Sequence, residues 1–430
     1  MTPRTPNAPR SIHPSRGGAL LSAMLLLLLM ASAALATSRH LTDQARQQAS
    51  GRSIAALAQA KDALIGYAFS YPELHDEENI GYLPCPDKTN NGSTSLGACN
   101  VRNHGAIGRF PYRTLGLPIL RDGHGQCLWY AVAGSVKHNP KPLTLNWDSP
   151  GQFRVISPSG RAISGEEHDV IAVILAPGAA LPGQLRPPAS TSTQHCPGSA
   201  NAFDDLPSFI DRTYANDVSG KLDIVHGEPD TNVNDIAAWI TIDELFSILR
   251  RRPDFPAMID TVLDAAATAL QPHLDSIDPG TPTGSTGTAF LAGQAEAIIG
   301  NRAHGRLPDS ATLGSAAAAI YDNWHDQLRF VACMDGSACL VAALTDSATS
   351  PPVSITETCR ALVLFGGERL RGNAPQRRST AAERADAAQY LEGINHASFT
   401  TGVGNYAGYR HYAVTGHDLP GSEDLIRCIP

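Results

Sequence analysis

Residues 17–36, GGALLSAMLLLLLMASAALA, decide the fold, and they carry no charged side chain. At ~1.5 Å per residue, an α-helix of this length spans about 30 Å, the thickness of the apolar core of a bilayer. Arg4, Arg10 and Arg16 precede the run, and the first acidic residue of the chain is Asp43. Because positive charge is retained on the cytoplasmic side, the sequence predicts one membrane span with the body of the chain outside the cytoplasm.

The helical pattern continues beyond this run. Residues 19–71 contain no proline, and Pro72 then ends the stretch. Apolar side chains at Ile54, Leu57, Leu64 and Ile65 recur at helical spacing. The pattern predicts one continuous helix over residues 19–71, ~80 Å long, whose first half lies in lipid and whose second half packs on a globular head.

A cleaved signal peptide is the alternative interpretation of the N-terminus. Ala34, Leu35 and Ala36 fit the small-x-small rule for signal peptidase. Both interpretations export the body of the chain. They differ in whether the body stays tethered to the membrane.

Composition agrees with an exported, folded protein. Hydrophobic residues make up 42% and charged residues 17% of the chain, which suits a packed core. The net charge of −8, with no basic stripe in the body, argues against binding of nucleic acid.

All eight cysteines follow the apolar run, and an even number is typical of an oxidising compartment. Eight cysteines allow 105 connectivities. Pairs Cys85–Cys99 and Cys333–Cys339 are expected to close short loops, and Cys359–Cys428 is expected to staple the C-terminus. No C-x-x-C pair is present, which argues against a zinc site. The disulfide candidates are Cys85, Cys99, Cys127, Cys196, Cys333, Cys339, Cys359 and Cys428.

Several motifs carry a family resemblance. A basic leader ends in Arg16-Gly17-Gly18 before Ala19, and LPCPD (83–87), GRFPYRTLGLP (108–118), DGHG (122–125) and LWYAV (128–132) follow in the head. Over residues 16–245 the chain resembles type IV pilin-like proteins, in particular large minor pseudopilins of type II secretion and type IV pilus systems. The resemblance implies processing by prepilin peptidase at Gly17, Gly18 and Ala19, with the cut after Gly17 or Gly18.

The resemblance also implies a place and partners for the protein. The expectation is a structural subunit, not an enzyme, in the bacterial inner membrane with its body in the periplasm. Its partners would be other pilin or pseudopilin subunits, prepilin peptidase and inner-membrane lipid. Typical pilins carry a glutamate at the fifth mature position, where this chain has Ser22 or Ala23. A tip position without an upper neighbour is one hypothesis, and a chain that the peptidase never cuts is another.

The expected fold class is α+β, with the long helix packed on an antiparallel-sheet, pilin-like head. Expected strands cover residues 127–133, 153–157, 170–176, 328–333 and 359–365, and expected helices cover residues 240–250, 257–270 and 289–299. The expected organisation is a basic leader (1–18), the long helix (19–71), a head (72–235), a helical segment with a linker at 278–287 (236–302), and a C-terminal α+β region (303–430).

The C-terminal region is either a degenerate repeat of the head or similar to it by chance. LWYAV (128–132) is echoed by LRFVA (328–332), VILAPG (173–178) by LVLFGG (362–367), and GRFP (108–111) by GRLP (305–308). The three echoes occur in the same order. A true repeat would be a second head without its own anchor helix.

The sequence offers no catalytic motif, and we predict no metal or cofactor. It contains no G-x-S-x-G elbow, H-E-x-x-H helix, Walker loop or dinucleotide fingerprint after a strand. DKTNNG (87–92) matches the start of a calcium loop, but Ala98 stands where a glutamate ligand is needed, so a turn is favoured. Two functions remain: the favoured pseudopilin-like subunit, and an anchored or secreted periplasmic enzyme or binding protein.

Overall fold

The computed structural model describes residues 16–75, 79–94, 97–165, 169–187, 195–212, 214–215, 217–227, 232–313, 319–346, 349–370, 376–412 and 424–430. Most of the expected basic leader, residues 1–15, lies outside the described residues. The protein is mixed α+β: one long N-terminal apolar helix leads into a body built on two sheets with antiparallel and parallel pairs.

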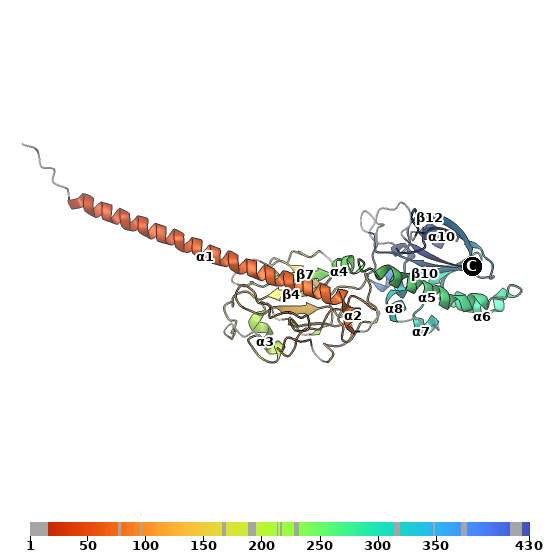
Figure 1. Cartoon of the computed structure of the whole chain (residues 1–430), viewed down its shortest axis with the longest axis horizontal. Coiled ribbons are helices and arrows are strands. Elements are labelled where there is room, and N and C mark those ends of the chain that lie inside the picture. Colours follow the sequence, from red (N-terminus) through yellow and green to blue (C-terminus); the bar gives the residue numbers. More distant parts are fainter. Residues whose placement is uncertain are drawn as a thin grey trace, which may run out of the picture.

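Helix α1 (Arg16–Phe69) is continuous for 54 residues and confirms the expected long helix within three residues at each end. A short helix, α2 (Tyr71–His75), follows it directly. Figure 1 shows the N-terminal part of α1 projecting from the body and its C-terminal part lying along the first sheet.

The first sheet has seven strands in the order β5-β1-β2-β4-β3-β6, with β7 paired to β4. The expected strands at 127–133, 153–157 and 170–176 are β2, β3 and β4. The strands are β1 (Gly105–Arg109), β2 (Trp129–Val132), β3 (Phe153–Ile156), β4 (Val170–Ala176), β5 (Asp217–Val218), β6 (Leu222–Val225) and β7 (Ile236–Thr241). Helix α3 (Ala202–Phe209) contacts β1, and α4 (Ile242–Leu249) contacts α1 and β7.

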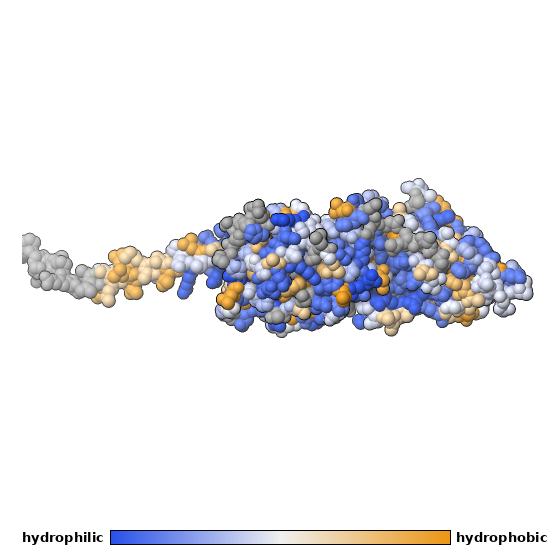
Figure 2. All heavy atoms as spheres, turned by 90° about the horizontal axis from the view of Figure 1, so that it is seen from below, coloured by the Kyte–Doolittle hydropathy of each residue, from blue (hydrophilic) through white to orange (hydrophobic). Residues whose placement is uncertain are grey.

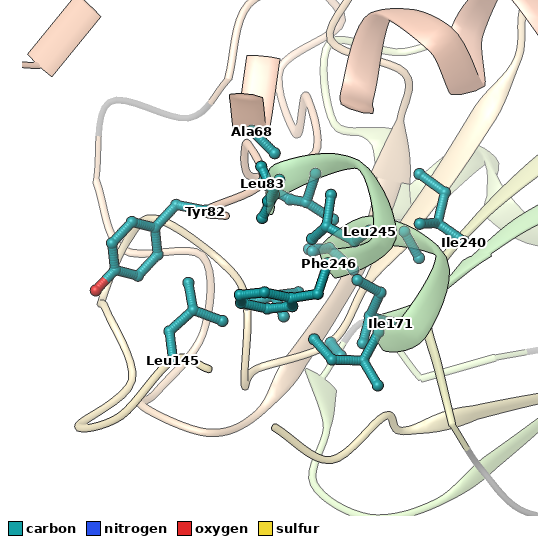
Figure 3. Close-up of a cluster of buried hydrophobic side chains, with 14 of the residues drawn as sticks. Ala68, Tyr82, Leu83, Leu145, Ile171, Ile240, Leu245 and Phe246 are labelled. Atoms are coloured by element: carbon teal, nitrogen blue, oxygen red, sulfur yellow. The ribbon is translucent and has the colours of Figure 1, made fainter. Parts of the chain in front are cut away.

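Strand β4 lies at the centre of this sheet, and all seven of its side chains are buried. Its uninterrupted sequence VIAVILA suits a strand that is covered on both faces. α1 packs against β4 and β7. Figure 3 shows the resulting cluster, which brings together side chains from α1, β4, β7, α4 and the connecting segments: Ala68, Tyr82, Leu83, Leu145, Ile171, Ile240, Leu245 and Phe246.

The second sheet has eight strands in the order β12-β11-β14-β15-β13-β10-β9-β8. They are β8 (Ala295–Ile299), β9 (Arg302–Arg306), β10 (Leu328–Cys333), β11 (Leu340–Asp346), β12 (Val353–Cys359), β13 (Ala361–Phe365), β14 (Asn405–Tyr409) and β15 (Leu425–Ile429). Its helices are α5 (Phe255–Asp275), α6 (Thr286–Gln294), α7 (Ser310–Leu313), α8 (Ala319–Trp324), α9 (Ala381–Ala385) and α10 (Gly393–Thr401). This second sheet lies at the end of the body opposite the free end of α1 (Figure 1).

The three sequence echoes occupy matching positions in the two sheets. In the first sheet Gly108 on β1 pairs with Tyr130, Tyr130 with Ile174, and Ile174 with Ala238 on β7. In the second sheet Gly305, Phe330, Val363 and Arg427 follow one another in the same way across β9, β10, β13 and β15. Each set of four strands is antiparallel throughout, and both sets follow the register of the aligned sequences.

A helix covers the corresponding strands in each sheet. α1 packs on β4 and β7, and α5 packs on β13 and β15. Asp260 and Asp264 of α5 hold Arg427 of β15 at 3.2 and 2.6 Å. The second sheet therefore has a packed helix of its own, which the sequence interpretation had assigned to a separate helical segment.

The expectation of a helix over residues 289–299 is wrong in its second half. α6 ends at Gln294, and Ala295–Ile299 form β8, which pairs with β9 in a hairpin. Gly300, with a φ of +61°, supplies the left-handed turn between the two strands. Strand pairing therefore overrides the helical preference of the alanines.

The helix expected from residue 240 begins two residues later, at Ile242. Strand β7 extends to Thr241, and Thr241 Oγ1 accepts from the N–H of Glu244 and so caps the start of α4.

Four disulfides join all eight cysteines. Cys85–Cys99, Cys333–Cys339 and Cys359–Cys428 are the three pairs expected from the sequence. The fourth, Cys127–Cys196, ties the start of β2 to the segment before α3, 69 positions away.

Candidate functional site

The exposed half of α1 is the most unusual surface of the molecule. From Leu21 to Ser38 it carries no charge, and Arg39 is the first charged residue after this stretch. Figure 2 shows it largely in orange, followed by a blue stretch before the body. By length and composition α1 is able to cross a membrane, and no part of its apolar window is buried in the molecule. The exposed large apolar side chains are Leu21, Met24, Leu25, Leu26, Leu27, Leu28, Leu29, Met30 and Leu35.

Two hydroxyl groups on this segment form hydrogen bonds to the backbone of the helix itself. Ser32 Oγ donates to the carbonyl of Leu29 at 2.9 Å, and Thr37 Oγ1 donates to the carbonyl of Ala33 at 2.7 Å. Unsatisfied polar groups are costly in hydrocarbon, so these bonds suit a lipid environment.

The DGHG turn (122–125) packs closely against α1 where the helix enters the body. The N–H of Gly123 donates to Ser53 Oγ at 2.9 Å, and a Cβ at Gly123 would lie 2.0 Å from the carbonyl oxygen of Ala49. Asp122 holds the turn by accepting from the N–H groups of His124 and Gln126, each at 2.8 Å. Only glycine permits this approach of the turn to the helix backbone.

Arg252 caps the other end of α1. Its guanidinium donates to the carbonyl of Phe69, the last residue of the helix, and lies 5.0 Å from the Phe69 ring centroid. Asp254 at 2.7 Å and Glu73 at 2.6 Å raise the pKa of the Arg252 guanidinium. A cation at a helix C-terminus is favourable, so Arg252 stabilises the end of α1 and links it to the segment before α5.

The two sheets meet at a buried junction formed by Trp147 and Asp148. Trp147 lies 4.6 Å from Trp324 and 5.8 Å from Phe365 between ring centroids. Asp148 is 5% exposed and accepts from Arg378 at 3.0 Å and from the amide of Gln327.

Arg378 is fully buried at this junction, and its guanidinium carbon lies 4.2 Å from the Tyr390 ring centroid. Arg329, also buried, lies 4.1 Å from the same centroid. Asp148 from the first half of the chain therefore neutralises a guanidinium inside the second half, and the junction joins the two sheets firmly.

A cleft of ≈ 540 Å³ lies beside the junction, lined by both halves of the chain. Most polar side chains that line the cleft are hydrogen-bonded to neighbouring protein groups. Lys221 Nζ donates to the carbonyl of Gly151 at 2.6 Å, and Gln152 Oε1 accepts from Gly134 N at 2.6 Å. The described lining includes no histidine or cysteine, so it offers neither a Ser–His nor a Cys–His pair.

Polar side chains in the sequence motifs of the head make structural contacts. Arg109 of the GRFP motif is buried, with Asp205 at 2.7 Å and the Trp129 ring at 4.8 Å. Asp87 accepts from the N–H groups of Thr89 and Gly92 at 2.9 and 2.6 Å, so its carboxylate closes the turn. Within the part of the chain that the structure describes, no cluster of three His, Cys, Asp or Glu residues is placed to hold a metal ion.

The proposed processing residues Gly17, Gly18 and Ala19 lie at the start of α1 and are not among the residues that line the cleft. Sequence reasoning missed Asp148, Arg252, Gln327 and Arg378, because they belong to no motif. Asp148 and Arg378 are 230 positions apart and meet only in the folded chain.

No family model, curated protein or solved structure matches this chain.

Proposed function

We propose that this protein is a membrane-anchored structural subunit of the pseudopilin class, serving a type II secretion or type IV pilus assembly. The main observation behind the proposal is that α1 is divided into an exposed apolar half and a half that packs on the body. One continuous helix presents a bare apolar surface from Leu21 to Leu35 and then packs on a sheet from Ser53 onward. Such a helix joins a lipid-embedded anchor to a folded head without a flexible linker.

In this proposal the body lies in the periplasm of a bacterial cell and the anchor in the inner membrane. Four disulfides support an oxidising compartment. The partners are other pilin or pseudopilin subunits, prepilin peptidase and membrane lipid. The absence of a glutamate at Ser22 or Ala23 supports a tip position, where no subunit lies above.

The proposal also treats residues 255–430 as a degenerate copy of the head. The matching register of β1-β2-β4-β7 and β9-β10-β13-β15, and the helix on the corresponding strands of each sheet, support a duplication. α5 then stands in the position of the packed half of α1 and lacks an apolar extension.

An anchored or secreted periplasmic enzyme or binding protein is the second candidate, and the cleft between the sheets favours it. The mixed lining points to a polar ligand. Most of the described polar groups there already hold loops, which is why we place this candidate second.

The test is the N-terminal peptide of the mature protein, measured by mass spectrometry in cells with and without prepilin peptidase. The proposal expects a peptidase-dependent start at Gly18 or Ala19, with a methylated amine. A matched variant, Ala36→Leu, blocks signal-peptidase cleavage after residue 36 and is expected to leave this start unchanged.

Two outcomes would contradict the proposal. A start at Thr37 that Ala36→Leu abolishes would make the apolar run a signal peptide and the mature protein free of any anchor. An intact N-terminus in the presence of the peptidase would retain the anchor and remove the pseudopilin assignment.

A further inference from the structure

The cleft beside the junction has the size of a small-molecule site. Its volume is ≈ 540 Å³, within the ~300–1,000 Å³ range of such sites, and both halves of the chain line it. Most of its polar side chains are already bonded to protein groups. The polar groups that remain without a partner therefore indicate which ligand the cleft can hold.

Arg384 offers the free edge of a guanidinium to this cleft. Its Nη1 donates to the carbonyls of Arg378 and Ser379, at 3.3 and 3.1 Å. Among the described residues, no group accepts from its Nε or Nη2, and no carboxylate forms an ion pair with it. Adjacent Nε and Nη2 groups match two oxygens of a carboxylate or a phosphate. The free edge of Arg384 therefore fits an anionic group of a ligand.

Tyr390 adds a second donor to the lining of the cleft. Its side chain is fully buried, and its hydroxyl has no hydrogen-bond partner in the described part of the chain. Burial raises the pKa of Tyr390 to about 12, so the hydroxyl stays protonated and able to donate. Leaving a buried hydroxyl unpaired costs free energy. An oxygen of the same anionic group would supply the missing acceptor.

The wall around Tyr390 carries more positive than negative charge. The guanidinium carbons of Arg329 and Arg378 lie 4.1 and 4.2 Å from the centroid of the Tyr390 ring. Asp148 balances Arg378 at 3.0 Å. Arg329 donates only to backbone carbonyls, and burial lowers its pKa to about 10. A buried charge without a counter-charge is costly, so an anion in the cleft is favourable.

The rest of the lining suits a ligand with several hydroxyl groups. The hydroxyls of Thr144 and Ser219, from the first half, and of Ser379, from the second, have no hydrogen-bond partner within the described ranges. Lys221 and Asp326 add one charge of each sign. Hydroxyl groups both donate and accept, so they pair well with the hydroxyls of a sugar. An apolar ligand would leave these groups unpaired.

We propose that the cleft binds an anionic sugar. Its carboxylate or phosphate oxygens accept from the free edge of Arg384 and from the Tyr390 hydroxyl. Its hydroxyl groups exchange hydrogen bonds with Thr144, Ser219 and Ser379. The site goes beyond the anchoring proposal and does not depend on it. The N-terminal peptide does not report on the cleft, so the two proposals fail separately.

The experiment is isothermal titration calorimetry on the full chain in detergent. The ligands are D-glucuronate, D-glucose-6-phosphate and D-glucose, which share one ring and differ in the group that carries the charge. At least one anionic sugar is expected to bind tenfold or more tightly than glucose. Arg384→Gln removes the charge and the paired donors, and it is expected to weaken that binding about tenfold or more. The matched control is Arg251→Gln, an exposed arginine outside the lining, which is expected to leave binding unchanged.

Tyr390→Phe is a second variant that separates binding from folding. Because the hydroxyl has no partner in the free protein, its loss is expected to leave the urea midpoint unchanged and to weaken binding of the anionic sugar about tenfold. The tighter of the two anionic sugars assigns the carboxylate or the phosphate.

Several outcomes would overturn the proposal. They are no binding of either anionic sugar, equal binding of glucose, and unchanged affinity in the folded Arg384→Gln or Tyr390→Phe chain. Acetate or inorganic phosphate binding as tightly as the matching anionic sugar would overturn the sugar assignment, because the hydroxyl groups of the ligand would then contribute nothing.

Discussion

At the scale of single residues, Asp148 links the two halves of the chain at the junction through Arg378 and Gln327. It is nearly buried and balances the charge of Arg378, which is fully buried. Asp148→Ala leaves that guanidinium without its carboxylate in a medium of low dielectric, so we expect the free energy of unfolding to fall by about 3–5 kcal/mol. Urea denaturation of the full chain in detergent measures the loss.

The matched control for Asp148 is Asp223→Ala. Asp223 binds Arg154 at a comparable distance, 2.8 Å, but both side chains are about one-third exposed. Water screens an exposed pair, so the expected loss is below about 1 kcal/mol. Equal losses for the two variants would show that the junction carries no more energy than a surface ion pair.

A second residue-scale prediction concerns Asp235. Burial raises the pKa of its carboxyl well above the ordinary value, and the neighbouring Asp211 raises it further. A carboxyl with a raised folded-state pKa costs stability as the pH rises from its unfolded value, ~3.9, through the folded one. Asp235→Asn removes this cost and keeps an acceptor for the N–H of Asp211, which lies 2.8 Å from Asp235 Oδ2.

We therefore expect Asp235→Asn to raise the melting temperature at pH 7 and to have little effect near pH 4. Calorimetric scans across this range measure the difference. A lower melting temperature at pH 7 would show that a positive charge compensates Asp235 in the folded protein.

At the scale of elements, the end of α1 depends on Arg252. Arg252→Ala removes the donor to the carbonyl of Phe69 and the stacking on its ring. We expect a loss of about 1–2 kcal/mol and faster hydrogen exchange of the amides in the last turn of α1. Arg251→Ala, at the exposed neighbouring position, is the control and is expected to leave exchange unchanged. Unchanged exchange in Arg252→Ala would remove the capping role.

Elements were predictable from the sequence where one local pattern decides them. α1 follows from a long apolar run without proline, and β4 follows from a continuous apolar run rich in valine and isoleucine. β8 was not predictable, because the segment AEAII favours a helix by itself and becomes a strand only by pairing with β9. Asp148 and Arg378 were not predictable for a related reason, since a contact across 230 positions leaves no local pattern.

At the scale of the whole molecule, the three sequence echoes predicted that the two sheets share an arrangement of strands. Each echo includes residues of a strand, and the three keep one register across both sheets. The role of α5 could not be predicted, because its sequence does not say which sheet it covers. The sheets bury α5 and the packed half of α1 in equivalent positions and leave only the projecting half of α1 bare.

The chain itself offers a test of what the long disulfide loops contribute. Cys359–Cys428 and Cys333–Cys339 lie in the same sheet, and each joins one fully buried and one half-buried cysteine. They differ in loop length, with sequence separations of 69 and 6. Loop closure in the unfolded chain predicts a loss of about 4 kcal/mol for Cys359→Ala with Cys428→Ala and about 2 kcal/mol for Cys333→Ala with Cys339→Ala. Because the side-chain cavities are matched, the difference in unfolding free energy between the two double variants measures the constraint on the unfolded chain. Equal losses would mean that packing around the sulfurs, and not the closing of the C-terminus onto β12, sets the stability of the second sheet.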